Sequence, residues 1–413
     1  MKFFYQIGIR AYAAAIAFAA PFNAKASEWI RGRRNWRENL KKNRETGARY
    51  IWFHCASLGE FEQGRPLLEA IRKDFPHYRI ALSFFSPSGY SIRKNYDQAE
   101  LIHYLPLDTA GNARDYLEIL QPELAIFVKY EVWPEFFLEM KTRTIPLVML
   151  SASFRPDHRY FKKSASWLLD LLKIPQFIFV QNSKSLDLLK SNGIQTAIMS
   201  GDTRFDRVLA LKATKSDLSE LQTFAADRKL IVFGSSWEKE EELAALLLGK
   251  ISQDWALVIV PHDISVGRIE SLNSQFAADA QMLSKLSNQT KSKVLIVDSI
   301  GLLGKIYGMA ELAVVGGGFR GALHNILEPA VYGIPVCFGN NHDRYPEAAD
   351  MLEAGGAIDG HDPSSLFLEI MGLINDKERL KICGMRALQY IEANTGATDR
   401  VLKVLKSNEL LRN

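Results

Sequence analysis

The chain has 413 residues, of which 47% are apolar and 24% are charged. This composition is typical of a soluble globular protein and excludes a disordered chain, a collagen and a disulfide scaffold. The formal net charge of +4 is too small to predict nucleic-acid binding over the whole surface. Cys55, Cys337 and Cys383 are far apart among apolar neighbours, which predicts buried free thiols in a reducing compartment.

The first 44 residues differ in composition from the rest of the chain. Residues 7–22 are apolar apart from Arg10, and residues 25–44 carry eight basic side chains. A membrane span needs about 20 apolar residues, more than this interrupted stretch offers. We therefore expect residues 1–44 to form a membrane-associating helix and a basic flank, with aromatic side chains at the interface and cations at anionic head groups. The aromatic residues expected there are Phe3, Phe4, Tyr12, Phe18, Phe22 and Trp29. A cleaved secretory signal and an apolar helix docked on its own domain are the alternatives.

In the rest of the chain, short β-rich runs alternate with segments of helical length, which is the pattern of parallel βαβ units. The predicted strands are 50–54, 79–85, 124–128, 146–150 and 177–180, then 230–234, 256–260, 294–297, 312–315 and 335–338. We expect two Rossmann-like domains, 45–207 and 229–413, joined by a polar linker at 208–228. Ligands are expected in a cleft between the domains, at the carboxyl ends of the strands. The C-terminal helices either close the second domain or cross back to the first.

The segment 54–60, HCASLGE, marks the end of the first predicted strand and the start of a helix. Ser57 and Glu60 have the spacing of a capping box, in which both side chains satisfy free N–H groups of the helix. The alternative is that Glu60, at the carboxyl edge of the sheet, is a general base. Gly59 favours this second interpretation, because it allows close approach of a substrate and a simple cap does not need it.

Two further segments place charged side chains after strands. Glu131, in the segment YEVWP at 130–134, follows the strand 124–128 and also lies at a strand's carboxyl end. Two carboxylates at one edge suggest a catalytic site, and a solvated loop acid is the alternative for Glu131. Arg204, in GDTRFD at 201–206, either supplies a cation beside a leaving phosphate or pairs with Asp202 or Asp206 on the surface.

The most specific pattern is VGGGF at 315–319, followed by HNILEPA at 324–330. Glycines let a backbone approach a ligand closely, and a helix N-terminus offers free N–H groups to a phosphate. Glu328, one turn into the predicted helix, is placed to accept hydrogen bonds from both hydroxyls of a ribose. The NAD and ATP motifs, G-x-G-x-x-G and the Walker loop, are missing. A tight glycine loop with a capping asparagine is the alternative.

Together these segments resemble the Kdo transferases, which add 3-deoxy-D-manno-octulosonic acid (Kdo) to lipid A precursors. Residues 54–60 are similar to the family's H-x-x-S-x-G-E, 131–134 to its E-x-W-P, 201–206 to its G-x-x-K-F-D, and 316–328 to its V-G-G-S and H-N-x-L-E-P segments. The matches run in the same order over nearly the whole chain. The resemblance implies two Rossmann-like domains of the glycosyltransferase B type, an acceptor at the first domain and a CMP-Kdo donor at the second.

The resemblance also implies roles for single residues. It makes Glu60 the proton acceptor and makes Glu131 and Arg204 the residues that stabilise the transition state, with arginine in place of the family's usual lysine. The residues that it implies in CMP binding are Pro261, His262, Ile300, Gly301, Leu302, Asn325, Ile326, Leu327 and Glu328, and we expect Gly316 and Gly317 beside them. The family's P-R-H reads PHD at 261–263, and its G-E-L reads GLL at 301–303.

We therefore expect an inverting glycosyltransferase that moves Kdo from CMP-Kdo to a lipid A precursor, lipid IVA, at the cytoplasmic side of the inner membrane. The expected partners are the donor, the acceptor and a membrane surface, without nucleic acid. The sequence has no D-x-D motif in strand context and no cluster of metal ligands, so we expect no metal and no other cofactor. The alternatives are another two-domain glycosyltransferase or a sugar-nucleotide epimerase that uses a uridine nucleotide, and a periplasmic solute-binding protein.

Overall fold

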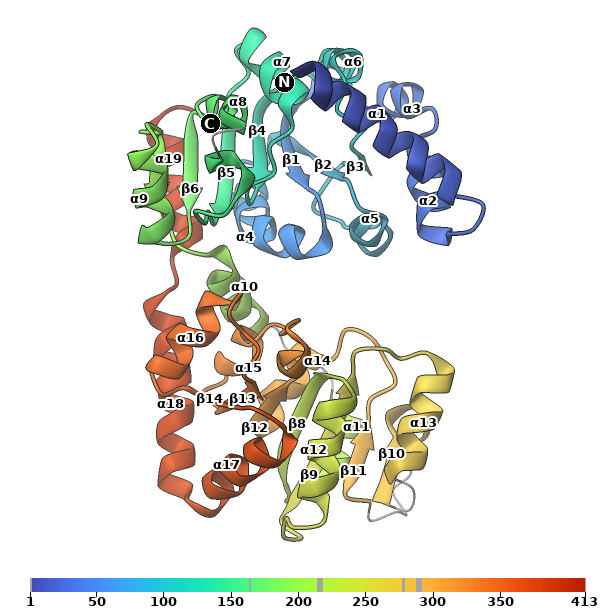
Figure 1. The fold of residues 1–413 in the computed structure, drawn as a ribbon, viewed down its shortest axis with the longest axis vertical. Coiled ribbons are helices and arrows are strands. Elements are labelled where there is room, and N and C mark those ends of the chain that lie inside the picture. Colours follow the sequence, from blue (N-terminus) through green and yellow to red (C-terminus); the bar gives the residue numbers. More distant parts are fainter. Residues whose placement is uncertain (1, 163–164, 214–217, 277–278, 287–291, 413) are drawn as a thin grey trace. The chain divides into compact units, whose positions relative to one another are not determined.

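The computed structural model describes residues 2–162, 165–213, 218–276, 279–286 and 292–412. It divides into two compact units (Figure 1). The first unit is Met1–Arg207 with Thr395–Asn413, and the second unit is Val208–Asn394. Each unit is built on one parallel sheet of seven strands, so the predicted architecture of two parallel-sheet α/β domains is confirmed.

The sheet of the first unit has the strand order β3-β2-β1-β4-β5-β6-β7. Its strands are β1 (Arg49–Cys55), β2 (Tyr78–Phe84), β3 (Leu101–Tyr104), β4 (Pro122–Val128), β5 (Leu147–Ala152), β6 (Phe177–Val180) and β7 (Ala197–Met199). Helices α4 (Leu58–Asp74) and α19 (Ala397–Ser407) cover one face, and α3 (Trp36–Asn43), α6 (Ala110–Leu120), α7 (Pro134–Thr142) and α8 (Ser166–Leu171) cover the other. The remaining elements of this unit are α1 (Lys2–Ala19), α2 (Ala24–Arg33), α5 (Pro87–Arg93), η1 (Arg159–Phe161) and α9 (Ser183–Ser191).

The central strands are apolar on both sides because helices cover both faces of the sheet. In β1, Tyr50 and Trp52 belong to one core, while Ile51 and Phe53 belong to the other. Alternation along a strand sends neighbouring side chains to opposite faces, so one run of apolar residues fills two cores. All three cysteines are buried and unpaired, as predicted.

The second unit repeats this plan with the strand order β10-β11-β9-β8-β12-β13-β14. Its strands are β8 (Lys229–Ser236), β9 (Trp255–Pro261), β10 (Ala280–Met282), β11 (Val294–Ile296), β12 (Ala310–Val315), β13 (Val336–Gly339) and β14 (Ala357–Gly360). Its helices are α11 (Ser219–Ala225), α12 (Glu238–Leu248), α13 (Val266–Phe276), α14 (Leu303–Ile306), α15 (Leu327–Ala330), α16 (Pro346–Glu353), α17 (Pro363–Asn375) and α18 (Lys377–Ala393), with the short turns η4 (Leu283–Lys285), η5 (Tyr307–Met309) and η6 (Gly318–Arg320). Helix α10 (Thr203–Lys212) carries the chain from the first unit into the second.

The unit boundaries differ in two places from the predicted domains. The segment 208–228, predicted as a linker, contributes Leu221 and Phe224 of α11 to a core of the second unit. The C-terminal helix α19 belongs to the first unit, where Val401 and Leu405 pack in the same core as α4. The C-terminal helix α19 therefore crosses back to the first unit, which was one of the two alternatives that the sequence left open.

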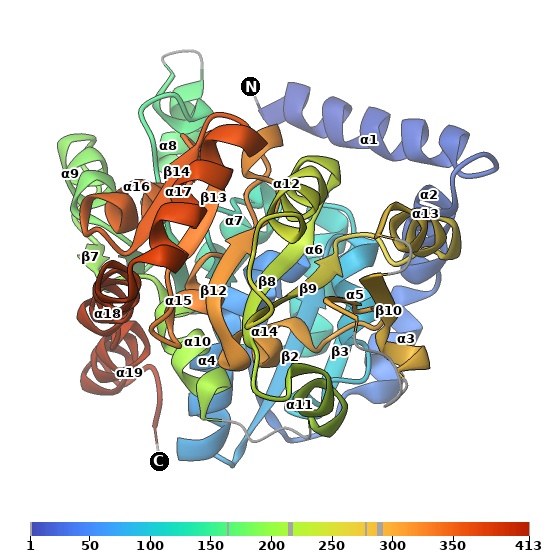
Figure 2. The ribbon, with the colours of Figure 1, turned by 90° about the horizontal axis from the view of Figure 1, so that it is seen from below.

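Helix α1 lies along the outside of the first unit and is joined to α2 by a short turn (Figure 2). Polar contacts hold it there. The Tyr5 hydroxyl donates to Asp108 at 2.6 Å, and the Gln6 amide donates to Glu135 at 3.0 Å. Asp108 is fully buried and also accepts from the N–H groups of Glu135 and Phe136 at the start of α7. The helix is therefore docked on its own domain by one of its faces.

The opposite face of α1 is apolar and exposed. Phe4, Ile7 and Phe18 lie on this face, and Phe22 follows in the turn, 87% exposed. In the described part of the chain, no helix is long and apolar enough to span a bilayer. The side chain of Phe3, which we also expected at a membrane interface, lies outside the described residues.

Two expectations for the basic flank are corrected. Trp29 is buried against Phe85 and so is not at an interface. Arg33 packs on the Trp29 ring and donates to the backbone carbonyls of Phe85 and Leu105. This cation is therefore a structural part of the first unit. The basic residues of the flank that stay exposed are Lys25, Arg31, Arg34, Lys41 and Lys42.

Candidate active site

Glu60 lies at the first turn of α4, directly after the central strand β1. Its side chain is almost completely buried. The carboxylate oxygen Oε2 accepts from the N–H groups of Ala56 and Ser57, which is the glutamate half of a capping box. Within the described residues, no hydrogen bond reaches the other oxygen, Oε1. Glu60 therefore caps the helix with one oxygen and keeps the other for a further partner.

The structure brings Glu131 close to Glu60, at the end of the neighbouring strand β4. Burial and the nearby negative charge of Glu131 raise the pKa of Glu60 to about 8, against the opposing effect of Lys129. Burial also raises the pKa of Glu131, while the cations Arg159 and Lys129 oppose that shift. A carboxyl group with a pKa near neutrality can accept a proton at physiological pH, so the site has the chemistry of a general base.

Sequence reasoning missed Lys129 and Arg159, the two cations beside this carboxylate pair. Lys129 directly follows β4 and has a φ of 63°, a left-handed conformation that is uncommon for residues other than glycine. Its N–H donates to the Leu150 carbonyl at 2.7 Å. Backbone strain of this kind collects at functional sites. Only its position one residue after an apolar strand could have pointed to Lys129 in the sequence.

Arg204 forms an ion pair with Asp202, one of the partners that the sequence allowed. Its guanidinium approaches the Asp202 carboxylate at 2.7 and 2.8 Å, and its N–H also donates to that carboxylate. Asp202 is buried and Arg204 is partly exposed. The charge of Arg204 is thus balanced within the protein.

Asp206, in the same segment, has a structural role. Its carboxylate accepts from the Gly396 N–H at 2.6 Å and from the Thr398 N–H and hydroxyl at 2.7 and 2.6 Å. These groups lie at the start of α19, where N–H groups lack partners inside the helix. Asp206 therefore anchors the C-terminal helix to the first unit.

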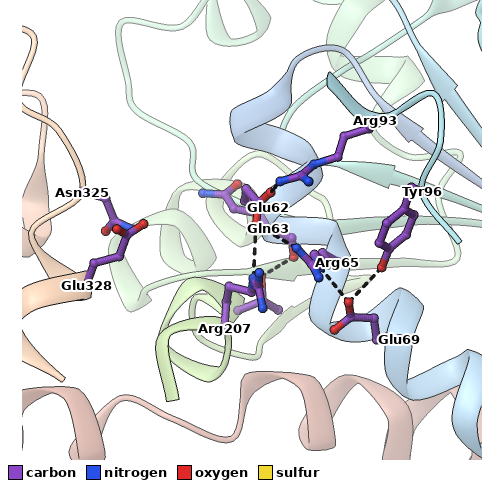
Figure 3. Close-up of polar contacts among 10 residues, drawn as sticks. Glu62, Gln63, Arg65, Glu69, Arg93, Tyr96, Arg207, Asn325 and Glu328 are labelled. Atoms are coloured by element: carbon purple, nitrogen blue, oxygen red, sulfur yellow. Dashed lines mark hydrogen bonds and ion pairs between the residues drawn. The ribbon is translucent and has the colours of Figure 1, made fainter. Parts of the chain in front are cut away.

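Half-buried arginine side chains surround Glu62 of α4 (Figure 3). Arg93 and Arg207 contact its carboxylate at 2.6 and 3.2 Å. Arg65 reaches Glu69 at 2.6 Å, and Tyr96 donates to the same carboxylate at 2.9 Å. This network ties α4 to α5 and α10, and it supports the helix that carries Glu60.

In the second unit, the glycines of the segment 315–319 serve close packing. A Cβ on Gly316 would lie 2.0 Å from the Ser235 carbonyl oxygen, and Gly317 has a φ of 86°. The Gly317 N–H donates to the buried carboxylate of Glu240 at 3.0 Å. These contacts match the alternative of a tight glycine loop.

The segment 325–328 also forms local contacts. The Asn325 side-chain oxygen accepts from the Leu327 N–H at 3.2 Å, and its amide donates to Glu328 at 3.1 Å, although the N-cap of α15 is Ile326. Ile326 and Leu327 are buried. Of the predicted residues 300–302, Ile300 is 84% exposed and Gly301 has a left-handed φ of 91°. Their role in donor binding stays a prediction.

A stack of rings lies at the carboxyl ends of three adjacent strands, β9, β8 and β12. The His262 ring is 4.6 Å from both the Trp237 and the His324 ring, and the Arg320 guanidinium lies 4.1 Å from the Trp237 ring centre. Burial and the nearby His262 lower the pKa of His324 to about 4. Of these four residues, sequence reasoning assigned only His262, which follows Pro261 at the end of β9, to the nucleotide site, and it noted His324 as the first residue of the segment 324–330. The position of Trp237 at the end of a central strand was the available signal.

The described residues contain no group of three or more His, Cys, Asp or Glu side chains arranged to hold a metal ion. Around Glu60 and Glu131, the Oε2 atom of Glu60 accepts from two backbone N–H groups, and the positive charge of Lys129 acts on the pKa of both carboxyl groups.

Comparison with known proteins agrees with the motifs. A family model described as 3-deoxy-D-manno-octulosonic-acid transferase (kdotransferase) matches residues 34–207. A protein of that name from Haemophilus influenzae is 27% identical over 370 residues, 86% of either chain. One from Aquifex aeolicus is 25% identical over 338 residues, 80% of this chain and 88% of that one. The predicted resemblance to the Kdo transferases is confirmed.

The Kdo transferase match includes Glu60, Glu131 and Arg204 and ends where the first unit passes into the second. Solved structures show the fold alone. A putative UDP-N-acetylglucosamine 2-epimerase from Listeria monocytogenes has a TM-score of 0.63 at 14% identity, and MurG from Acinetobacter baumannii has 0.56 at 12%. The alignments with these two structures cover 88% and 87% of this chain, and 97% and 99% of the epimerase and MurG chains, respectively. The fold is therefore shared with epimerases, whereas the similarity in sequence is to Kdo transferases.

Proposed function

We propose that this protein is an inverting glycosyltransferase that transfers Kdo from CMP-Kdo to a lipid A precursor in lipopolysaccharide biosynthesis. The observation that carries the proposal is the carboxylate pair of the buried Glu60 and the half-buried Glu131, with one free oxygen on Glu60, inside the segment that matches the Kdo transferases. The relatives' shared name supports Kdo as the sugar that is transferred.

In the proposed reaction, a hydroxyl oxygen of the acceptor sugar attacks the anomeric carbon of Kdo. The hydroxyl proton passes to Glu60, and Oε1 is the oxygen available to take it. The bond from the anomeric carbon to the phosphate oxygen breaks, and CMP leaves with the electron pair. Attack opposite the leaving group inverts the configuration. CMP is a good leaving group, so cations matter more here than a general acid. We assign this role to Arg204, and we propose Glu131 as the second residue that stabilises the transition state.

We place the donor in the second unit. Glu328 is proposed to accept from the ribose hydroxyls, and Pro261, His262 and the segment 300–302 are proposed to line the nucleotide site. The ring stack of Trp237 and His262 supports this placement, because it lies at the carboxyl edge of a parallel sheet, where ligands of this fold class bind. The reaction is proposed to need no metal and no further cofactor.

We also propose that the protein associates with the cytoplasmic face of the inner membrane through α1. Its exposed apolar face carries Phe4, Ile7 and Phe18, and exposed cations follow in α2 and α3. An interfacial helix with this composition binds a lipid surface without spanning it. Because the proposed acceptor is a lipid, association with a membrane surface brings the protein to its substrate.

The test is incubation of the purified protein with CMP-Kdo and lipid IVA, with the product read by mass spectrometry. We expect product masses higher by one Kdo residue or more, and the spectrum also shows how many are transferred. CMP should inhibit the reaction, and UDP should not. The absence of any Kdo product, together with turnover of a UDP-sugar, would replace this proposal with the uridine-nucleotide alternative.

A further inference from the structure

Gln63 is a buried polar residue that neither the motifs nor the proposed reaction uses. It lies in α4, three residues after Glu60, and its side chain is only 2% exposed. The amide oxygen of Gln63 has no hydrogen-bond partner among the described residues. An unpartnered buried amide oxygen costs folding stability, and native proteins rarely keep one without a reason.

The position of Gln63 is tightly fixed. Its backbone carbonyl accepts from the Thr203 hydroxyl at 2.5 Å, and that hydroxyl lies 2.8 Å from the Ser151 hydroxyl. Ser151 is the penultimate residue of β5, within an irregularity in the pairing of β5 with β6, and it has a left-handed φ of 52°. Such irregularities are frequent beside active sites, where they redirect a side chain.

The direction of the side chain links Gln63 to the candidate active site. Residues three apart on a helix share a face, and helical side chains lean toward the N-terminus of the helix. Gln63 therefore leans toward the turn that carries Glu60. Figure 3 shows its side chain pointing away from the ion pair of Arg65 and Glu69.

We propose that Gln63 binds the acceptor, with its side-chain amide forming a hydrogen bond to the acceptor sugar beside the hydroxyl that Glu60 deprotonates. This inference rests on the proposed function and adds a residue to it. An amide both donates and accepts, so it can bind either a ring oxygen or a neighbouring hydroxyl. The free protein keeps an unsatisfied group that the bound sugar satisfies, so the bond orients the attacking hydroxymethyl group at Glu60.

The test is the Gln63→Met variant, which keeps the length of the side chain and removes its polar atoms. We expect a melting temperature equal to or above that of the wild type, because an unsatisfied buried group is removed. We expect the KM for lipid IVA to rise about tenfold, the effect of one lost hydrogen bond, while the affinity for CMP stays unchanged. Gln63→Leu should behave in the same way and serves if the methionine variant folds poorly.

The matched control is Gln222→Met on α11, where the glutamine is exposed and outside the site. It should change neither the KM nor the melting temperature. An unchanged KM for lipid IVA in both Gln63 variants overturns the inference and leaves the proposed function standing. If the wild type itself forms no Kdo product, the proposed function and this inference fall together.

Discussion

The negative charge of Glu131 raises the pKa of Glu60, so the pH dependence of the reaction depends on both carboxyl groups. The pKa of Glu60 is raised to about 8, and a base works only when it is ionised. Transfer, measured as kcat/KM, should therefore rise with pH up to about 8. In Glu131→Gln the neighbouring negative charge is lost, so the pKa of Glu60 falls. The rising limb of the pH–rate profile should therefore move to lower pH. A limb that stays in place in this variant would contradict the coupling.

Removal of the Lys129 charge should shift the rising limb of the pH–rate profile in the opposite direction. Its positive charge lowers the pKa of Glu60, so Lys129→Met should move the limb to higher pH. The pH–rate profiles of the two variants, measured in one buffer series, form a matched pair with shifts of opposite sign. A shift in the same direction in both variants would show that altered folding, rather than charge, causes it.

At the scale of single elements, the contact of Asp206 with α19 predicts a loss of stability. Three hydrogen bonds from the start of α19 converge on this carboxylate. Bonds to a charged group are worth about 1.5–3 kcal/mol each, and we expect Asp206→Ala to cost about 3 kcal/mol in total. For a domain of this size the melting temperature should fall by about 6–12 °C. Asp399→Ala, an exposed aspartate in the first turn of the same helix, is the control and should have little effect.

The predicted elements show where sequence patterns suffice. All ten predicted strands are present, and the four that were missed, β3, β7, β10 and β14, are the outer strands of the two sheets. Central strands are apolar on both faces and stand out in a sequence. Outer strands have three or four residues here and are partly exposed, as in AQM and AIDG, so no apolar run marks them.

The candidate site could be predicted only in part. Glu60 and Glu131 were found because they follow strands of one parallel sheet, whose carboxyl ends share an edge. Lys129 was missed because its role depends on a left-handed backbone that the sequence does not reveal. The glycines at 316 and 317 were assigned to ligand approach, which stays a prediction, and the sequence did not reveal that they also pack against the backbone of Ser235 and Ala322. Tertiary packing of this kind joins residues that are far apart in the chain.

At the scale of the whole molecule, the exposed face of α1 predicts membrane association. The variant Phe4→Ser, Phe18→Ser, Phe22→Ser should lose at least tenfold in binding to vesicles that contain anionic lipids, because apolar burial drives interfacial binding. High salt should weaken the wild type only partly by screening the exposed cations. The measurement is co-sedimentation with the vesicles.

The control for this experiment removes exposed apolar side chains elsewhere, in Val266→Ser, Leu368→Ser. These changes should leave sedimentation with vesicles unchanged. If the triple variant of α1 pellets as the wild type does, the association with membranes does not depend on this helix.

The central claim is that Glu60 accepts the proton of the acceptor, and the most direct measurement compares Kdo transfer in the wild type and in Glu60→Gln. The amide oxygen keeps the cap on Ala56 and Ser57 but is not a base. Because the folded-state pKa of about 8 lies above the unfolded value of 4.5, ionisation of Glu60 costs stability as the pH rises through this range, and the neutral variant escapes that cost. We predict no detectable transfer, unchanged CMP binding and, at pH 8.5, a melting temperature at or above that of the wild type. Transfer at the wild-type rate would show that Glu60 only caps α4 and would contradict the account.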